Sequence, residues 1–217
     1  MSKTFANEWP GIVLILLFHA VGLAGFSSAK WAPLFEQIVP LHLLLMLGVV
    51  IWYHRPKNKA FFITLFLLML AGWSVEWLGV RTGKIFGHYQ YGSTLGFKAD
   101  GIPLMIGVNW FLLVYSVTAL VQKIPGKNRW FRIFIGALML VLLDVFIEPI
   151  AIKFHYWSWA SHIPPLQNYI GWFVVSFVFL QAYALAGQKP GRYIGPALYI
   201  TQLLFFAVLG LGGKIGS

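Results

Sequence analysis

The 217-residue chain has no cysteine and little charge, since Asp, Glu, Lys and Arg make up only 10% of its residues. The absence of cysteine excludes disulfides, thiolate nucleophiles, iron–sulfur clusters and zinc sites with cysteine ligands. An ordinary soluble domain carries roughly 25% charged residues, whereas 59% of this chain is hydrophobic. The composition therefore excludes a typical soluble fold and indicates a polytopic membrane protein with a single integral-membrane domain, residues 1–217.

Acidic residues are scarce, with 6 against 16 Lys and Arg, and the formal net charge is +10. The cations lie in short segments beside apolar runs, where they orient a membrane protein and contact anionic lipid. We therefore expect membrane lipid, and no nucleic acid, as the partner of this basic charge.

Seven apolar stretches predict an all-α transmembrane bundle of about seven spans. They cover residues 11–28, 39–53, 60–80, 102–121, 131–152, 169–186 and 193–211. Each except the second approaches the roughly 20 residues that a helix needs to cross a bilayer. The second is short unless Pro40 lies inside its first turn, where proline is tolerated. Residues 24–29 could imitate a signal cleavage site, but we expect the first stretch to be retained.

The distribution of Lys and Arg predicts the orientation. One side of the bundle would carry Lys3, Arg55, Lys57, Lys59, Lys123, Lys127, Arg129, Arg132, Lys189 and Arg192, and the other Lys30, Arg81, Lys84, Lys98, Lys153 and Lys214. Basic residues are enriched in cytoplasmic loops. We expect a protein of the cell inner membrane with its N-terminus in the cytoplasm and its C-terminus outside.

Two of the expected outer connections have unusual compositions. Residues 82–101 are rich in Gly and aromatics, and residues 155–168 are rich in Trp and Pro. Near each, an acid is followed by Lys, Phe and His-Tyr, but the spacings differ, so an internal repeat is not indicated. Such segments predict ordered, Gly- and aromatic-rich caps on the outer side, re-entrant in form.

Three of the six acids, Glu76, Asp144 and Glu148, lie inside expected spans, where an ionisable group is costly and suggests a functional site. Asp144 and Glu148 share a helix face because they are four residues apart. In a low-dielectric pocket, a carboxylic acid beside another keeps its proton and can act as a general acid. The acids could instead pair with basic residues or cap a helix. Glu8 and Glu36 lie outside the spans, and we expect both to tolerate replacement by Gln.

Aromatic and amide side chains surround these acids. About half of the aromatics are expected to be membrane-interface anchors, and the others could line a pocket that stabilises a cation. The six histidines are scattered and predict no metal site. A retinal protein is excluded because the seventh stretch contains no Lys for a Schiff base.

At these motifs the chain resembles the integral-membrane carotenoid biosynthesis family whose characterised members are carotenoid 1,2-hydratases. The matching segments are residues 76–83, 86–91, 95–96, 102–104, 109–110, 144, 148–151, 157–159 and 165–172. The resemblance covers about half the chain, although Glu148-Pro149 stands where the family has Asp-Pro. It implies a cofactor-independent hydro-lyase that adds water to the terminal double bond of an acyclic carotenoid end group.

The chemistry of the residues agrees with this implication, because hydration needs an acid, a base and walls that tolerate a carbocation. We expect Asp144 or Glu148 to donate the proton and Glu76 to orient the water. Asn109 and Asn168 would position polar groups, and Trp77, Trp110 and Trp157 would stabilise the cation. The further substrate-binding candidates are Trp73, His88, Tyr89, Tyr91, Trp159 and Trp172.

The expected partners are an acyclic or monocyclic carotenoid, water, and other enzymes of the carotenoid pathway. Two other classes remain open on the sequence alone. A proton-coupled transporter also places carboxylates near helix ends and uses segments broken by Gly and Pro. A non-catalytic carotenoid-binding protein would need the pocket but not the acids.

Overall fold

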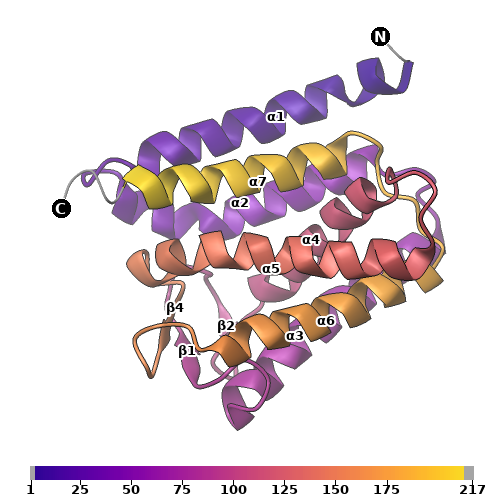
Figure 1. Ribbon diagram of the computed structural model, residues 1–217. Helices are drawn as coiled ribbons and strands as arrows, with labels where there is room; N and C mark the ends of the chain where they lie inside the picture. The colour runs from indigo at the N-terminus through magenta and orange to yellow at the C-terminus, as the bar shows by residue number, and fades with distance from the viewer. Residues whose placement is uncertain (1–2, 213–217) are drawn as a thin grey trace.

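The computed structural model describes residues 3–212 and shows a bundle of seven helices, with four short strands in its connections (Figure 1). The helices are α1 (Lys3–Phe26), α2 (Ala32–Tyr53), α3 (Lys59–Thr82), α4 (Met105–Val121), α5 (Arg129–Lys153), α6 (Leu166–Leu185) and α7 (Ile194–Gly212). The strands are β1 (Tyr89–Tyr91), β2 (Lys98–Ala99), β3 (Ile102–Pro103) and β4 (Trp157–Trp159). The predicted helical bundle is confirmed.

Local sequence signals set several helix ends. The side chains of Asn58 and Asn128 accept hydrogen bonds from the backbone N–H groups of Phe61 and Phe131, at 2.9 and 2.8 Å, and so cap α3 and α5. Such N-caps satisfy donors that the first turn leaves unpaired. At the other end of α3, Gly83 adopts φ 64°, a left-handed conformation that glycine enters without a Cβ penalty.

The second helix is longer than the sequence predicted. It begins at Ala32, with Pro33 in its first turn, and Pro40 lies in its interior. The prediction that this helix starts near residue 39 was therefore wrong, and α2 has 22 residues, enough to cross a bilayer. The proline that opens the helix is Pro33, whose fixed φ suits a first turn.

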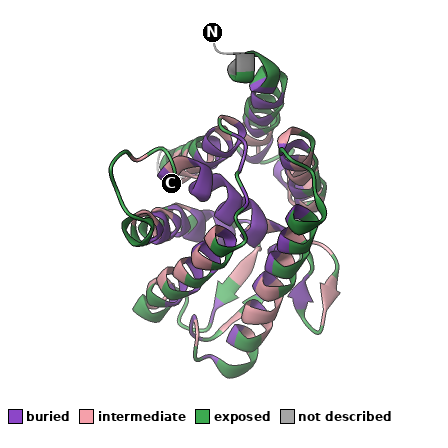
Figure 2. Cartoon of the chain, turned by 90° about the vertical axis from the view of Figure 1, so that its right-hand side faces the viewer, coloured by how far each residue is buried: buried purple, intermediate pink, exposed green. Residues whose placement is uncertain are grey.

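The fourth helix is the short one, with 17 residues, because Ile102 and Pro103 belong to strand β3. At 1.5 Å per residue, α4 is about 25 Å long, less than the roughly 30 Å of a hydrocarbon core. It packs against α2, α3, α5, α6 and α7, and 14 of its residues are buried. Figure 2 shows the buried residues at the centre of the bundle and the exposed ones on its outward faces. A helix that is covered by its neighbours does not need to match the bilayer.

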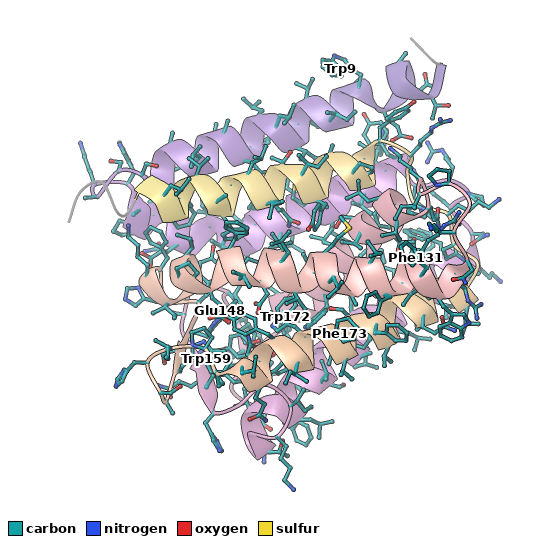
Figure 3. The ribbon with its side chains drawn as sticks, in the orientation of Figure 1. Trp9, Phe131, Glu148, Trp159, Trp172 and Phe173 are labelled. Carbon is teal, nitrogen blue, oxygen red and sulfur yellow. The ribbon has the colours of Figure 1, made fainter. Side chains whose placement is uncertain are left out.

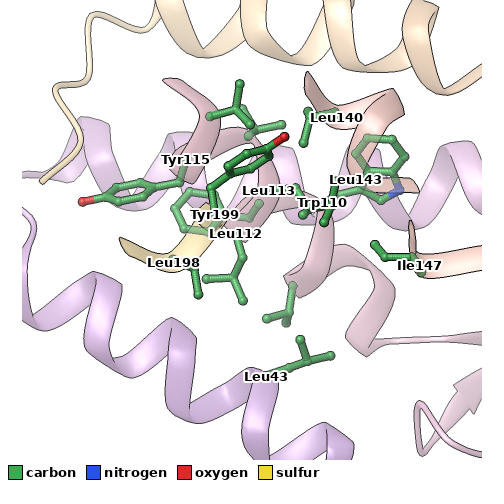
Figure 4. Close-up of a cluster of buried hydrophobic side chains, with 14 of the residues drawn as sticks. Leu43, Trp110, Leu112, Leu113, Tyr115, Leu140, Leu143, Ile147, Leu198 and Tyr199 are labelled. Atoms are coloured by element: carbon green, nitrogen blue, oxygen red, sulfur yellow. The ribbon is translucent and has the colours of Figure 1, made fainter. Parts of the chain in front are cut away.

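The packed core forms around this central helix. Figure 4 shows a cluster of buried side chains in which Trp110, Leu112, Leu113 and Tyr115 of α4 lie among residues of other helices. Those partners are Leu43, Leu140, Leu143, Ile147, Leu198 and Tyr199. The six other helices are long and apolar enough to cross a membrane, and their exposed Leu, Ile, Val and Phe side chains suit contact with lipid. The direction in which the bundle crosses the membrane remains a prediction, and Lys214, counted for the outer side, lies outside the described residues.

The sequence suggested that Glu8 and Glu36 lie outside the spans, but Glu36 lies inside α2 and Glu8 inside α1. Glu8 is buried. Its carboxylate accepts hydrogen bonds from the backbone N–H groups of Arg192, Tyr193 and Ile194, at 3.2, 2.8 and 2.9 Å. Ile194 is the first residue of α7, whose N–H group has no partner within the helix, and the other two donors directly precede it. Glu8 therefore caps α7 across the bundle, and its replacement is expected to destabilise the protein, contrary to the prediction from the sequence.

Candidate functional site

Strands β1 and β4 pair antiparallel at the end of the bundle where α1 and α7 end (Figure 1). Tyr89 pairs with Trp159, and Tyr91 pairs with Trp157. Because side chains alternate along a strand, these four rings lie on one face of the ladder. The middle residues of both strands, on the other face, are exposed. Two distant loops, both expected to be ordered, thus form one aromatic platform over the bundle.

The two tyrosines of β1 hold Glu76 of α3. The phenol of Tyr91 donates to Oε2 of Glu76 at 2.7 Å, and the phenol of Tyr89 donates to the same oxygen. The indole of Trp110 on α4 donates to Oε1 at 2.8 Å. Burial, with Glu76 beside them, raises the pKa of both Tyr89 and Tyr91 above the usual value. Both phenols therefore keep their protons and act as donors.

The two tryptophans of β4 hold Glu148 of α5. The indoles of Trp157 and Trp159 donate to Oε2 of Glu148 at 3.1 and 2.8 Å. The amide of Asn168, at the start of α6, donates to Oε1 of Glu148 at 3.2 Å and to Oδ2 of Asp144 at 2.7 Å. One amide therefore joins the two carboxyl groups of α5. Figure 3 shows Glu148 close to Trp159 and Trp172.

The three carboxyl groups differ in how many donors they receive. Glu76 and Glu148 each accept three hydrogen bonds, whereas Asp144 accepts one. Oδ1 of Asp144 is buried and has no partner among the described residues. Neither of the two ion pairs in the described part of the chain involves these acids. Their partners are neutral donors and not the basic residues that a structural role would use.

A cavity of about 20 Å³ lies between Glu76 and Glu148. A space of roughly 10–15 Å³ is enough for one water molecule, provided that polar groups face it. The cavity lining combines two carboxyl groups and two amides with aromatic rings. It consists of Glu76, Phe86, Tyr89, Tyr91, Ile106, Asn109, Ile147, Glu148, Trp157, Trp159, Asn168 and Trp172.

A second, larger cavity of about 380 Å³ adjoins the first. The two share Ile106, Asn109, Ile147 and Trp157 in their walls. The larger one is enclosed mainly by α1, α2, α4, α5 and α7, and most of its lining is apolar. Its volume lies in the usual range of small-molecule sites, roughly 300–1,000 Å³. A long apolar molecule could therefore place one end beside the acids.

The larger cavity also reaches the outward face of the bundle. Phe18 and Val21 of α1 and Leu41 of α2 line it, and the same side chains are exposed at the surface. An exposed apolar surface on a membrane-spanning helix faces lipid. The cavity therefore has an edge at α1 and α2 through which a lipid-soluble molecule could enter.

Residues 37–213 match the profile of the family described as "Carotenoid biosynthesis protein". The chain belongs to this carotenoid biosynthesis family. A curated relative, the bisanhydrobacterioruberin hydratase of Haloarcula japonica, is 27% identical in an alignment of 160 residues that covers 70% of this chain and 55% of the relative. The chain thus spans about half the length of that relative. No solved structure matches the chain.

In this member of the carotenoid biosynthesis family, most of the candidate site residues come together. The small cavity is lined by nine of them: Glu76, Glu148, Tyr89, Tyr91, Asn109, Trp157, Trp159, Asn168 and Trp172. Trp110 reaches it through its hydrogen bond to Glu76, and Asp144 through Asn168.

Three candidates lie elsewhere. The indole of Trp73 donates to the carbonyl of Ile102 at 3.3 Å, and His88 is exposed at the surface. The indole of Trp77 donates to Asp100 at 2.6 Å, and Arg81 pairs with the same oxygen. The hydrogen bond from Trp77 has the largest effect in lowering the pKa of Asp100, and the contact with Arg81 lowers it further. The structure therefore does not bring Trp77 to the cavity as a wall for a cation.

Sequence reasoning missed part of the lining. Phe86, Ile106 and Ile147 enclose the small cavity, and His19, His42 and Gln202 line the large one. The available signal for the last three was a polar residue inside an apolar span, which suggests function in a membrane helix. Among residues 3–212, no group of three or more His, Asp or Glu side chains is placed to hold a metal ion.

Proposed function

We propose that this chain is a carotenoid hydratase, which adds water to the terminal C=C bond of an acyclic carotenoid end group. The observation that carries the proposal is the one-water cavity between Glu76 and Glu148, beside a large apolar cavity. The name of the Haloarcula relative supports the same reaction class. An acid, a base, a water site and an apolar substrate site are the parts that alkene hydration requires.

Glu148 is the proposed proton donor because it lines the cavity, whereas Asp144 is fully buried behind it. Asn168 holds both groups through one amide. Two carboxyl groups that share one amide donor in a buried site favour holding one proton between them. Asp144 is then a positioning residue that keeps a proton available to Glu148. Transfer of that proton to carbon 2 of the end group leaves a tertiary cation at carbon 1.

Glu76 is the proposed base on the opposite side of the cavity. Three neutral donors stabilise its carboxylate, which orients the water. The water oxygen bonds to carbon 1 and its proton passes to Glu76, so the product gains the elements of one water molecule. A following water returns the proton to Glu148. The faces of Trp157, Trp159 and Trp172 enclose the cation, and an aromatic face attracts positive charge.

The test asks where the new atoms come from. The purified protein, given an acyclic carotenoid in ¹⁸O-labelled water, should yield a tertiary alcohol that carries the heavy oxygen. In D₂O the adjacent carbon should gain one deuteron. Both should occur anaerobically, with no added nicotinamide or flavin. Oxygen derived from dioxygen, or pigment that is bound but never converted, would contradict the proposal.

A further inference from the structure

Besides Asn109, Tyr156 and Trp157, the lining of the large cavity contains three polar side chains: His19 of α1, His42 of α2 and Gln202 of α7. The rings of His19 and His42 meet edge to face, with centroids 4.6 Å apart. Phe205 also packs against the ring of His19, at 5.8 Å between centroids. The three polar residues come from three different helices, so the fold itself brings them into one cavity.

Each of these side chains has hydrogen-bonding capacity that the protein does not use. Nδ1 of His19 lies 2.8 Å from the carbonyl oxygen of Ile15, which only accepts, so Nδ1 carries the proton and Nε2 of the neutral ring is an acceptor. Oε1 of Gln202 is buried without a partner, and within the described part of the chain no hydrogen bond involves the ring of His42. Buried polar groups normally have partners. The unused groups therefore indicate that a bound molecule supplies one.

The lining limits what this molecule can present. Among the described residues, the cavity wall contains no Asp, Glu, Lys or Arg, so no described side chain there neutralises a charged group. A carbonyl group only accepts, and it would leave Nε2 of His19 and Oε1 of Gln202 without a donor. A hydroxyl group accepts as well and also donates one hydrogen bond, so it can supply a donor to one of these two acceptors, which a carbonyl group cannot do.

We infer that His19, His42 and Gln202 form a subsite for a hydroxyl group of the carotenoid. The substrate would then be an acyclic carotenoid that already carries a hydroxyl group. This inference rests on the function proposed above for the reacting end. The subsite and the acids lie in adjoining cavities that share Asn109 and Trp157. One molecule can therefore place its double bond at Glu148 while its hydroxyl group binds at the histidine pair.

The experiment compares two acyclic carotenoids with the same reacting end, one with and one without a hydroxyl group, on the purified 217-residue chain in detergent. Binding is followed by quenching of tryptophan fluorescence and turnover by chromatography. The wild-type protein should bind the hydroxylated carotenoid at least tenfold more tightly, since sites built to bind a hydroxyl group discriminate against analogues that lack it. Gln202→Leu and His42→Leu should each reduce this preference about tenfold, because they weaken binding of the hydroxylated carotenoid more than binding of the hydrocarbon.

Gln181→Leu is the matched control, because Gln181 also has a buried, unpartnered Oε1 but does not line the cavity. It should keep the full preference. Equal affinity of the wild-type protein for both carotenoids would overturn the inference, as would an equal loss for both in the two subsite variants. A hydroxyl preference in binding without any turnover would uphold the subsite and refute the hydratase. Turnover without the preference would do the reverse.

Discussion

Replacement of Glu148 by Gln tests the proposed proton donor with the smallest change of shape. The variant keeps the length and hydrogen-bonding shape of the side chain but cannot supply a carboxylic proton. General acid catalysis contributes on the order of 10²–10⁴ in rate. At about 1.36 kcal/mol per factor of ten, the barrier should rise by about 2.7–5.4 kcal/mol.

The structural cost of the same replacement is smaller. The introduced amide can point its oxygen at the indoles of Trp157 and Trp159, which donate to Oε2 of the native Glu148 at 3.1 and 2.8 Å. Its NH₂ group would then face the amide of Asn168, which donates to Oε1 of the native carboxyl group at 3.2 Å. One hydrogen bond is lost, which costs about 1 kcal/mol. The protein should fold and yet be nearly inactive.

The assay measures conversion of an acyclic carotenoid by purified protein, with thermal unfolding in the same detergent as the check on folding. Glu36→Gln is the control, because the carboxylate of Glu36 pairs with the exposed ring of His155, at 3.2 Å, away from the small cavity. That variant should retain its activity. If Glu148→Gln keeps more than about a tenth of the wild-type rate with normal unfolding, the assignment of the donor is wrong.

Three further predictions concern topology and packing. Single cysteines at Asn58 and Ser161 should be labelled from opposite faces of the membrane, with Ser161 reached from outside; labelling of both from one face would refute the seven-span arrangement. Glu8→Ala should destabilise the protein by about 2 kcal/mol, the upper range for a lost helix cap, and a lowered unfolding temperature with retained activity per folded molecule checks this. Gly171→Ala should cost about 1–3 kcal/mol, since its Cβ would lie 2.5 Å from a backbone carbonyl oxygen. Gly210→Ala, whose Cβ would have no atom of the described residues within 4 Å, should leave the unfolding temperature unchanged or raise it.

The helices could be predicted because their signal is local. A run of about 20 apolar residues in lipid permits little else. The carboxyl groups were also visible, since Glu76, Asp144 and Glu148 stand out in apolar spans and the spacing of the last two sets a shared face. The expectation that each span approaches 20 residues failed for α4, which has 17. Neighbouring helices cover α4, so it does not need to match the thickness of the bilayer.

The rest depends on contacts between distant residues. Strands of three residues, such as β1 and β4, are too short for an alternating pattern to stand out, and their pairing joins loops about 70 residues apart. Glu8 caps a helix that begins 186 positions later, which no local pattern can show. His19 and His42 looked scattered because only the packing of α1 against α2 brings their rings to 4.6 Å. Motif spacing therefore identified the acids but not the walls of the large cavity.

The large cavity opens at Phe18, Val21 and Leu41, on the surface that faces lipid. The concentration that sets its occupancy is therefore the concentration of carotenoid in the membrane. A carotenoid that enters through this edge arrives by lateral diffusion within the bilayer and does not pass through water. Occupancy then depends on the mole fraction of carotenoid in the lipid. Adding empty lipid at a constant amount of carotenoid should slow conversion, whereas adding buffer at a constant lipid-to-carotenoid ratio should not. Half-saturation for such a protein is meaningful only as a surface concentration.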